Sequence, residues 1–276
     1  MDFSKYEASA NDFIMLDRTS GGALTGADEA SRMCERRTGV GADGVIEALP
    51  SQELDLKMRI LNADGSEAEM CGNGLRALFL FALDRGLTQA DEMTFETLAG
   101  PRRVRVAGEG PGGRLFSVEM GEPSWLRGDI PVQGPADQEA IDIEITLGSS
   151  VVEATCVSMG NPHCVVFVDD LAAYPVQSVG REIECHPMFP RKTNVEFVRV
   201  DAADRMQARV WERGVGETMA CGTGTCAVVV AASLKGLAGR SATVSLPGGP
   251  LQVEWPERQV VLTGPARHVF DGKTVG

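Results

Sequence analysis

Short stretches of alternating or β-branched apolar residues recur along most of the chain. The clearest lie at 56–61, 195–200 and 207–211, each flanked by polar or turn-forming residues. A period of two predicts β-strands, and clusters of glycine and proline at 108–113 and 247–249 predict turns between them. We therefore expect a β-rich chain, with further strands at 13–16, 102–106, 115–119, 141–147, 164–168, 243–246, 252–255 and 260–262.

Two longer segments break this pattern. Residues 75–86 and 225–236 are apolar on nearly every side and end at Gly86 and Gly236. A helix that is apolar all round must be buried all round. The valines of the second segment would also suit a strand, but an internal repeat favours a helix in both places. Each half of the chain is thus expected to curl a sheet around one central helix.

This repeat has an offset of 150 residues and aligns 59–77 with 209–227 without a gap. The matched pairs include Arg59 and Arg209, Glu67 and Glu217, Cys71 and Cys221, and, outside this block, Asn11 and Asn161. One offset that holds at separated places indicates two homologous halves. We expect an α+β fold of two pseudo-symmetric, β-rich, barrel-like domains, each wrapped around a central helix, with the active site in the cleft between them. The domains would span 1–120 and 121–263.

The composition narrows the range of partners. The net charge is −13 and only 5% of the residues are aromatic, which is unsuited to binding nucleic acid. Polar residues are spread through 1–17, whereas a secretory signal has an uninterrupted apolar stretch there. The longest apolar run, 226–234, is far shorter than the ~20 residues that a membrane helix needs. We expect a cytoplasmic protein that binds a small molecule and neither nucleic acid nor membranes.

Cysteine usage points to reactive thiols. The seven cysteines form no Cys-x-x-Cys pair, so neither a disulfide framework nor a zinc finger is expected, and no metal site is predicted. A cysteine taken alone is usually a small buried apolar residue. Cys71 and Cys221, however, stand in matching Cys-Gly-x-Gly turns directly before the two predicted helices. A helix N-terminus can hold a carboxylate and lower the pKa of an adjacent thiol.

Two such helices facing each other would place one sulfur on each side of a bound α-carbon. Inverting a stereocentre needs a proton removed from one face and a proton delivered to the other, which two symmetric acid–base groups do directly. No cofactor is expected, so hydrogen-bond donors at the carboxylate would have to stabilise the charge that develops. The pattern therefore predicts an amino-acid epimerase that uses Cys71 and Cys221 as paired acid and base.

Residues near the second cysteine add polar chemistry. Glu212 occupies the position of Asn62 in the first half and could take an ammonium group or a cysteine proton. Arg213, which follows it, could bind a carboxylate through two hydrogen bonds. His163 lies two residues after Asn161 and could carry protons, although a lone histidine is usually structural.

Other charged or glycine-rich stretches suggest no chemistry. Lys5, 35–37 and 169–170 are expected to be solvated surface charge. Residues 39–44 match Gly-x-Gly-x-x-Gly, but they follow a charged, helix-like stretch and no strand. The context of a dinucleotide site is therefore missing.

Blocks along the whole chain resemble the diaminopimelate epimerase family. They are Asn-Asp-Phe at 11–13, the glycine-rich 39–44, the runs 62–76 and 211–227, Gly-Asn-Pro-His at 160–163, and Asn194. The resemblance implies two β-rich domains that close over the substrate, and a last strand, 264–276, that returns to the first domain. It implies interconversion of LL- and meso-2,6-diaminopimelate in lysine and peptidoglycan precursor synthesis, with no pyridoxal cofactor, in a homodimer.

The resemblance also implies residue roles. Cys71 and Cys221 would be the two bases, and His163 and Glu212 would tune their thiols. Backbone amides would hold the reacting carboxylate, and polar side chains would bind the rest of the substrate. The amides are those of Gly72, Asn73, Gly222 and Thr223, and the side chains are Asn11, Asn62, Asn161, Asn194, Glu212 and Arg213.

The chain departs from the family in two places. Glu7-Ala8-Ser9-Ala10 stands where the family has His-Gly-x-Gly, and Gly44 stands where a glutamine is often found. We expect Asn11 to be presented differently as a result.

Three alternatives stay open. A two-thiol racemase for a histidine- or proline-type amino acid would keep the chemistry and change the substrate, although the polar set around Arg213 suits a second amino–carboxylate head. A non-catalytic or metal-binding relative would use Cys71, Cys221 and His163 as ligands. Oxidation could also join the two thiols in an empty site and inactivate the enzyme.

Overall fold

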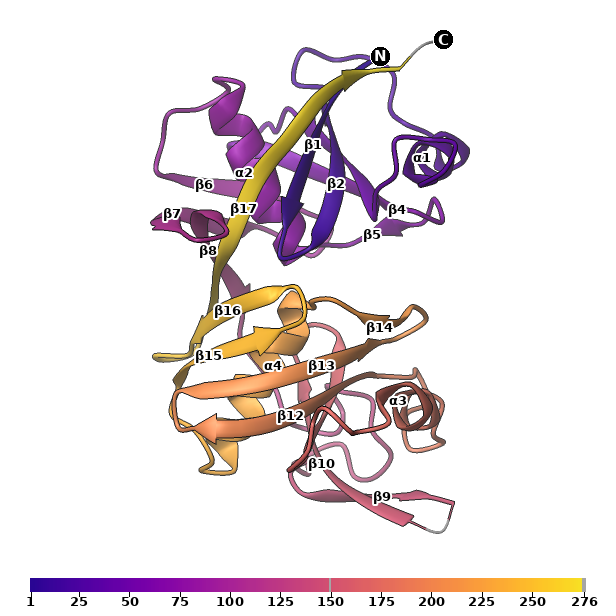
Figure 1. Ribbon diagram of the computed structural model, residues 1–276. Coiled ribbons are helices and arrows are strands. Elements are labelled where there is room, and N and C mark those ends of the chain that lie inside the picture. Colours follow the sequence, from indigo (N-terminus) through magenta and orange to yellow (C-terminus); the bar gives the residue numbers. More distant parts are fainter. Residues whose placement is uncertain (149, 275–276) are drawn as a thin grey trace. The chain divides into compact units, whose positions relative to one another are not determined.

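The structure is a computed structural model that describes residues 1–148 and 150–274. The chain forms two compact units, one of Met1–Glu119 with Thr263–Gly276 and one of Met120–Leu262. Figure 1 labels most of the elements of the two units.

The first unit is a twisted β-structure with two helices. Its elements are β1 (Asp2–Ala8), β2 (Asn11–Asp17), α1 (Ala27–Cys34), β3 (Gly44–Leu49), β4 (Leu56–Asn62), β5 (Glu67–Ala68), α2 (Gly72–Asp84), β6 (Glu92–Glu96), β7 (Arg102–Gly110), β8 (Gly113–Gly121) and β17 (Val260–Lys273). Strand β17 pairs with β1, so the two ends of the chain meet (Figure 1). There the amino group of Met1 donates to Thr274 Oγ1 at 2.8 Å.

The second unit has the same kinds of element. They are β9 (Ile143–Leu147), β10 (Ser150–Ser158), β11 (Pro162–Phe167), α3 (Val176–Glu184), β12 (Asn194–Ala202), β13 (Arg205–Glu212), β14 (Gly216–Thr218), α4 (Gly222–Leu234), β15 (Ser241–Leu246) and β16 (Gly249–Glu254). One core cluster of this unit lies between strands and α3, with Phe197 and Ile183 fully buried in it.

Both units pair their strands in the same way. Strand β2 runs parallel to β3, and β11 runs parallel to β12, in registers that differ by the offset of the repeat. Each parallel pair continues into an antiparallel one, β3–β4 and β12–β13. The ion pair between Arg59 Nε and Glu67 Oε2, at 3.3 Å, recurs between Arg209 Nε and Glu217 Oε1, at 2.8 Å. The sequence repeat thus corresponds to a repeated fold.

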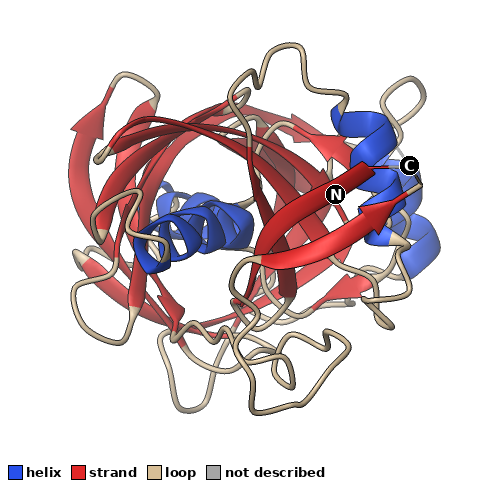
Figure 2. Ribbon diagram, turned by 90° about the horizontal axis from the view of Figure 1, so that it is seen from below, coloured by secondary structure: helices blue, strands red, loops and turns tan. Residues whose placement is uncertain are grey.

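A buried helix lies within each unit, as the apolar pattern predicts. Every residue of α2 from Gly72 to Ala82 is buried, and so is every residue of α4 from Gly224 to Ala232. Figure 2 shows such a helix enclosed by strands. Each helix is followed closely by a glycine with φ of 68°, in the left-handed conformation that commonly ends helices.

Each predicted strand overlaps a strand of the structure, but β1, β3, β6, β10 and the short β5 and β14 were not predicted. Charged residues interrupt the apolar pattern of these strands, and some of them are buried beside partners distant in sequence. The prediction that Lys5 is solvated surface charge is wrong, because this residue of β1 is only 6% exposed.

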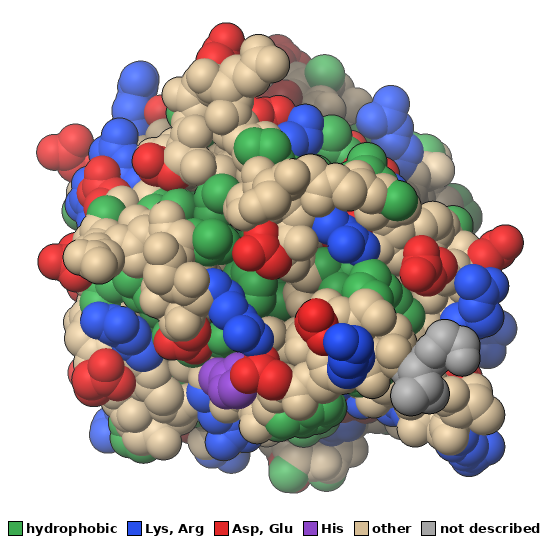
Figure 3. All heavy atoms as spheres, turned by 90° about the horizontal axis from the view of Figure 1, so that it is seen from above, with side chains coloured by type: hydrophobic (Ala, Val, Ile, Leu, Met, Phe, Trp, Pro, Cys, Tyr) green, Lys and Arg blue, Asp and Glu red, His purple; other side chains and the backbone are tan. Residues whose placement is uncertain are grey.

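The described residues include no helix that is both long and apolar enough to cross a membrane. On the face seen in Figure 3, acidic and basic side chains are interspersed.

Candidate active site

Cys71 and Cys221 occupy matching positions at the start of the two buried helices. Each is the N-cap, with φ and ψ of −140° and 116° at Cys71 and −129° and 116° at Cys221. In each turn the sulfur accepts a hydrogen bond at 3.4 Å from the amide three residues later, that of Gly74 or Gly224. The sulfur thus replaces the oxygen that usually caps a helix.

The glycine three residues after each cysteine packs closely against side chains of a neighbouring strand. A Cβ at Gly74 would lie 2.8 Å from Ile46 Cδ1, and a Cβ at Gly224 would lie 2.5 Å from Glu196 Oε1. The first turn of each helix therefore lies directly on the strand beside it. This contact fixes where each sulfur is presented.

The predicted carboxylate-binding amides lie at the first two positions of each helix. These are Gly72 and Asn73 in α2, and Gly222 and Thr223 in α4. Amides at these positions have no intrahelical acceptor and carry the partial positive charge of the helix N-terminus. Each cysteine turn can therefore bind one end of a carboxylate.

Around Cys71 the structure brings together two of the predicted residues. The thiol donates to Asn11 Oδ1 at 3.8 Å, and the same oxygen accepts from Asn73 Nδ2 at 3.3 Å. Asn62, at the end of β4, is exposed, and its Nδ2 donates to Ser66 Oγ at 3.0 Å.

Around Cys221 a chain of hydrogen bonds runs from the surface into the core. The sulfur lies 3.5 Å from Thr223 Oγ1, which accepts from Asn161 Nδ2 at 3.3 Å. Asn161 Oδ1 lies 3.0 Å from His163 Nε2. The other ring nitrogen, Nδ1, lies 2.7 Å from Glu196 Oε1, with both side chains 0% exposed.

The acid–base balance at Cys221 differs from the one predicted. Burial raises the pKa of the Cys221 thiol well above its ordinary value, and the carboxylates of Glu212 and Glu196 add to that rise. Hydrogen bonds from Thr223 and Gly224 oppose it without reversing it. The expected net lowering is therefore wrong for Cys221, because desolvation disfavours the thiolate more strongly than the helix-turn donors favour it.

Glu212 lies close to this thiol. Burial raises its pKa above 4.5, against the hydrogen bonds from Thr218 and Cys221 and the charge of His163. Thr218 Oγ1 donates to Glu212 Oε1 at 2.6 Å. A carboxyl group held this way can exchange a proton with the sulfur beside it.

Asn194 and Arg213 form one structural element. The buried Asn194 side chain donates to Pro162 O at 2.9 Å and accepts from the Arg213 amide at 2.9 Å. It therefore fixes the backbone at Arg213, whose guanidinium is exposed and donates to Arg191 O at 3.1 Å. Both hydrogen bonds of Asn194 are internal, so its contribution here is to hold the turn.

Glu196 was not predicted, yet it is central to this site. At the repeat offset, the buried His163 and Glu196 stand where the first half has the buried Phe13 and Ile46. Glu196 Oε2 is also buried and has no hydrogen-bond partner among the described residues. The sequence does contain an indication of its role, because this glutamate lies in a largely apolar predicted strand at a position where the other half has isoleucine.

Residues 7–10, where the chain departs from the family pattern, include the turn between β1 and β2. Ser9 and Ala10 both have positive φ, 55° and 62°, a region that favours glycine. Side chains stabilise the turn instead. Glu7 Oε2 accepts from the Ala10 amide at 2.9 Å, and Ser9 Oγ accepts from Arg76 Nη2 at 3.0 Å.

The arrangement in each unit can be compared with known proteins. The sequence model described as diaminopimelate epimerase matches residues 3–126 and 155–269. The chain belongs to this family. It is 48% identical to the diaminopimelate epimerase of Pelotomaculum thermopropionicum over 278 residues, or 99% of this chain and 98% of that one. The one from Microcystis aeruginosa is 50% identical over 279 residues, covering 98% and 97%. The predicted family, and with it the class of isomerase, is confirmed.

Solved structures with other descriptions share the fold. A phenazine biosynthesis protein of the PhzF family from Bacillus anthracis has a TM-score of 0.72 at 18% identity, covering 100% of this chain and 99% of that one. A probable proline racemase from Agrobacterium radiobacter has a TM-score of 0.70 at 15% identity, covering 99% and 92%. At these identities the likeness shows the fold alone, and it confirms the predicted β-rich α+β class.

Proposed function

We propose that the chain interconverts LL- and meso-2,6-diaminopimelate by a two-base mechanism in which Cys71 and Cys221 act on opposite faces of one α-carbon. Membership of the family supports an epimerase of diaminopimelate in lysine biosynthesis. The observation that carries the mechanism is the duplicated turn, in which each cysteine caps a buried helix in the same backbone conformation. We take the two units to be the two epimerase halves that bind the substrate between them.

The proton transfers balance without any cofactor. The thiolate of one cysteine takes the α-hydrogen as a proton, and the electron pair left behind spreads into the adjacent carboxylate. The thiol of the other cysteine then gives its proton to the opposite face. The two sulfurs end with exchanged protonation states, so the reverse reaction uses the same groups in exchanged roles. The amides of Gly72, Asn73, Gly222 and Thr223 would stabilise the charge on the carboxylate.

The same proposal assigns the substrate's other groups. Glu212 and Arg213 offer a carboxylate and a guanidinium, and Asn11, Asn62 and Asn161 add amide groups. Asn194 would act through the Arg213 backbone, which it holds. A substrate with a second amino–carboxylate head needs such a set, whereas a simple amino acid does not. His163 and Glu212 would adjust the proton affinity of the Cys221 thiol, since both lie in its hydrogen-bonded surroundings.

A substrate panel tests the proposal. LL-Diaminopimelate, L-proline and L-histidine are incubated separately with the protein, and the stereoisomers are separated by chiral chromatography. We expect meso-diaminopimelate from the first and no inversion of the others. Inversion of proline or histidine alone would keep the two-thiol chemistry and overturn the substrate.

A matched pair of variants tests the role of Arg213. Replacing Arg213→Gln removes a charge-assisted contact to the substrate and should raise KM about tenfold or more. Arg37→Gln, at another exposed arginine, is the control. Equal KM values for the two variants would remove Arg213 from the binding set.

The homodimer and the cytoplasmic location also belong to the proposal. Sedimentation tests the homodimer directly, since the chain has a mass of 29.4 kDa. A particle of one chain mass across the working concentration range would overturn it.

A further inference from the structure

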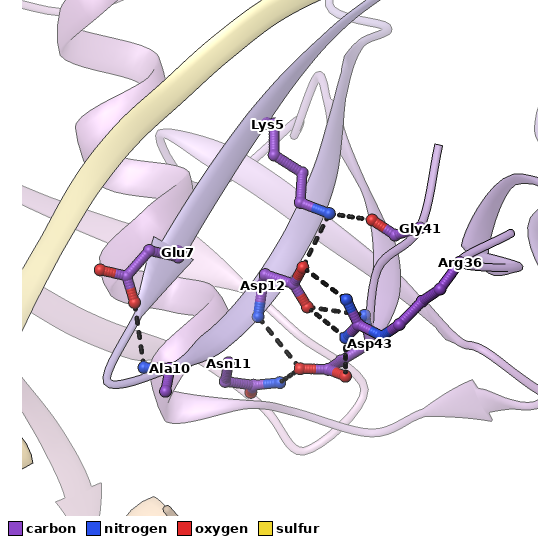
Figure 4. A network of polar contacts seen from close by, with 8 residues as sticks. All are labelled: Lys5, Glu7, Ala10, Asn11, Asp12, Arg36, Gly41 and Asp43. Carbon is purple, nitrogen blue, oxygen red and sulfur yellow. Dashed lines mark hydrogen bonds and ion pairs between the residues drawn. The ribbon is translucent and has the colours of Figure 1, made fainter. Parts of the chain in front are cut away.

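Beside Cys71, four charged side chains form a compact network that the mechanism above does not use. They are Lys5 of β1, Asp12 of β2, and Arg36 and Asp43 of the segment between α1 and β3 (Figure 4). The sequence suggested solvated charge for two of them, Lys5 and Arg36. The structure instead connects all four to Asn11, the residue that accepts from the Cys71 thiol.

We propose that Asp43, held by Arg36, is a positioning residue that fixes the Asn11 amide with its carbonyl oxygen facing Cys71. The key contact is the hydrogen bond from Asn11 Nδ2 to Asp43 Oδ2, at 2.8 Å (Figure 4). A carboxylate accepts and cannot donate, so only the NH₂ end of the amide can face it. The oxygen of Asn11 must then point the other way, toward Cys71 and Asn73.

Asp43 is held in turn from several sides. Its Oδ1 accepts from Arg36 Nη2 at 2.7 Å, and its Oδ2 also accepts from the Asp12 amide at 3.1 Å. Arg36 binds both oxygens of Asp12 as well, at 2.8 and 3.1 Å. A bidentate contact of this kind fixes the plane of the guanidinium as well as its distance.

Asp12 connects this set to the buried Lys5. Lys5 Nζ lies 2.7 Å from Asp12 Oδ2 and also donates to the Gly41 carbonyl. Burial favours the neutral form of Asp12, but hydrogen bonds from Arg36, Lys5 and Asp43 outweigh it and hold the pKa of Asp12 well below its usual range. The carboxylate form of Asp12 is therefore favoured between Lys5 and Arg36.

The glycine-rich stretch 39–44 serves this network. A Cβ at Gly39 would lie 2.1 Å from the carbonyl oxygen of Arg32, so the loop can fold back on α1 only if that residue is glycine. The returning loop then brings Asp43 to β2, where its amide donates to Asp12 O at 2.9 Å. The motif that resembled a dinucleotide loop is thus a support for Asn11.

The second half fixes its matching asparagine by other means. Asn161 Nδ2 donates to Thr223 Oγ1, and its Oδ1 faces His163 Nε2. Thr193 stands at the position of Asp43. The carboxylate support is therefore specific to the Cys71 side, where the amide oxygen is left facing the sulfur.

Replacing Asp43→Asn should release the Asn11 amide from its fixed orientation. The new side chain has one oxygen where the carboxylate had two, and donors face it on both sides. Arg36 Nη2 donates on one side, and Asn11 Nδ2 and the Asp12 amide donate on the other. Either orientation of the new NH₂ therefore opposes a donor and weakens the contact that holds the oxygen of Asn11 toward Cys71. A thiol whose acceptor is held less firmly is stabilised less, which favours the thiolate over the thiol.

The kinetic consequence rests on the proposed function. Misplacing a group beside the reacting atoms should lower kcat/KM by about tenfold to a hundredfold. Asn11→Ala, and the variant that combines it with Asp43→Asn, complete a double-mutant cycle. The matched control is Glu35→Gln, which changes an exposed carboxylate of the same loop. In the Asn11→Ala background, Asp43→Asn should cost about twofold or less, because its effect acts through Asn11. An equal loss in both backgrounds overturns the proposal.

Thiol alkylation tests the same positioning without any substrate. Iodoacetamide labelling of Cys71 is measured peptide by peptide, with Cys221 as the internal reference. Because the thiolate is the nucleophile, Asp43→Asn should speed labelling of Cys71 relative to Cys221 by about threefold or more, and Glu35→Gln should leave the ratio unchanged. An unchanged ratio in Asp43→Asn overturns the positioning role. A changed ratio in a protein that does not epimerise diaminopimelate would support this role and overturn only the proposed function.

Discussion

Replacing Glu196→Ile, to match Ile46 of the first half, should strongly destabilise the second unit. The substitution removes the acceptor that lies 2.7 Å from His163 Nδ1, and both side chains are fully buried. Removing one partner of a buried hydrogen-bonded pair costs about 3 kcal/mol, because the polar group of the other is left buried without a partner. For a chain of this size we expect a fall in Tm of roughly 10 °C.

Replacing both partners should largely reverse that loss. His163→Phe with Glu196→Ile reproduces the apolar pair Phe13 and Ile46, and apolar replacement of a whole buried pair is often neutral or stabilising. The packing is similar in the two halves, since a Cβ added at the helix glycine would lie 2.8 Å from Ile46 Cδ1 in one and 2.5 Å from Glu196 Oε1 in the other. We expect the double variant to lie within about 1–2 kcal/mol of the wild type in stability and to lose most of its epimerase activity.

Urea unfolding of the wild type, both single variants and the double variant measures the coupling, and chiral chromatography measures activity in the same preparations. We expect the double variant to lose much less free energy of unfolding than the two single variants lose in total. If the two losses simply add, the pair is not energetically coupled. A double variant with full activity would show that the buried pair of His163 and Glu196 has no part in the reaction.

Three further predictions follow from the same site and its support. Glu212→Gln removes a carboxylate that raises the pKa of the Cys221 thiol. Iodoacetamide should therefore label Cys221 faster at a given pH. Slower or unchanged labelling would contradict the effect of Glu212 on this thiol. Because folding raises the pKa of Glu212, the stability from this group is present below its unfolded value, near 4.5, and is lost as pH rises through its folded value. Glu212→Gln should therefore weaken the decline in stability above that pH, and an unchanged urea midpoint profile would refute this. Gly39→Ala should cost about 1–3 kcal/mol of stability through the clash with Arg32 O and should lower kcat/KM, as Asp43→Asn does. An unchanged kcat/KM would show that the loop does not support the site.

The repeat made much of the fold predictable. Matching Cys71 with Cys221 indicated a helix after each, although the valines of 225–236 suit a strand by propensity alone. Tertiary burial decides that conflict, since α4 lies inside its unit. Strands with a clear period of two were found for the same reason, because one face of each is covered.

The features that the sequence did not predict depend on contacts between residues that are distant in the chain. Lys5 is charged, and only its partners at Asp12 and Gly41 allow it to be buried in β1. Nothing local in β12 shows that Glu196 will meet His163, 33 positions earlier in the chain. The raised pKa of Cys221 likewise depends on burial and on carboxylates that the three-dimensional fold brings to it.

Solvent-deuterium exchange tests the two-cysteine mechanism most directly. LL-Diaminopimelate is incubated in D₂O with the wild type, Cys71→Ser and Cys221→Ser, and the α-carbon is followed by NMR and chiral chromatography. We predict deuterium at the inverted α-carbon in the wild type and collapse of inversion in both serine variants. Inversion that persists in either variant, or inversion without deuterium from solvent, would contradict it.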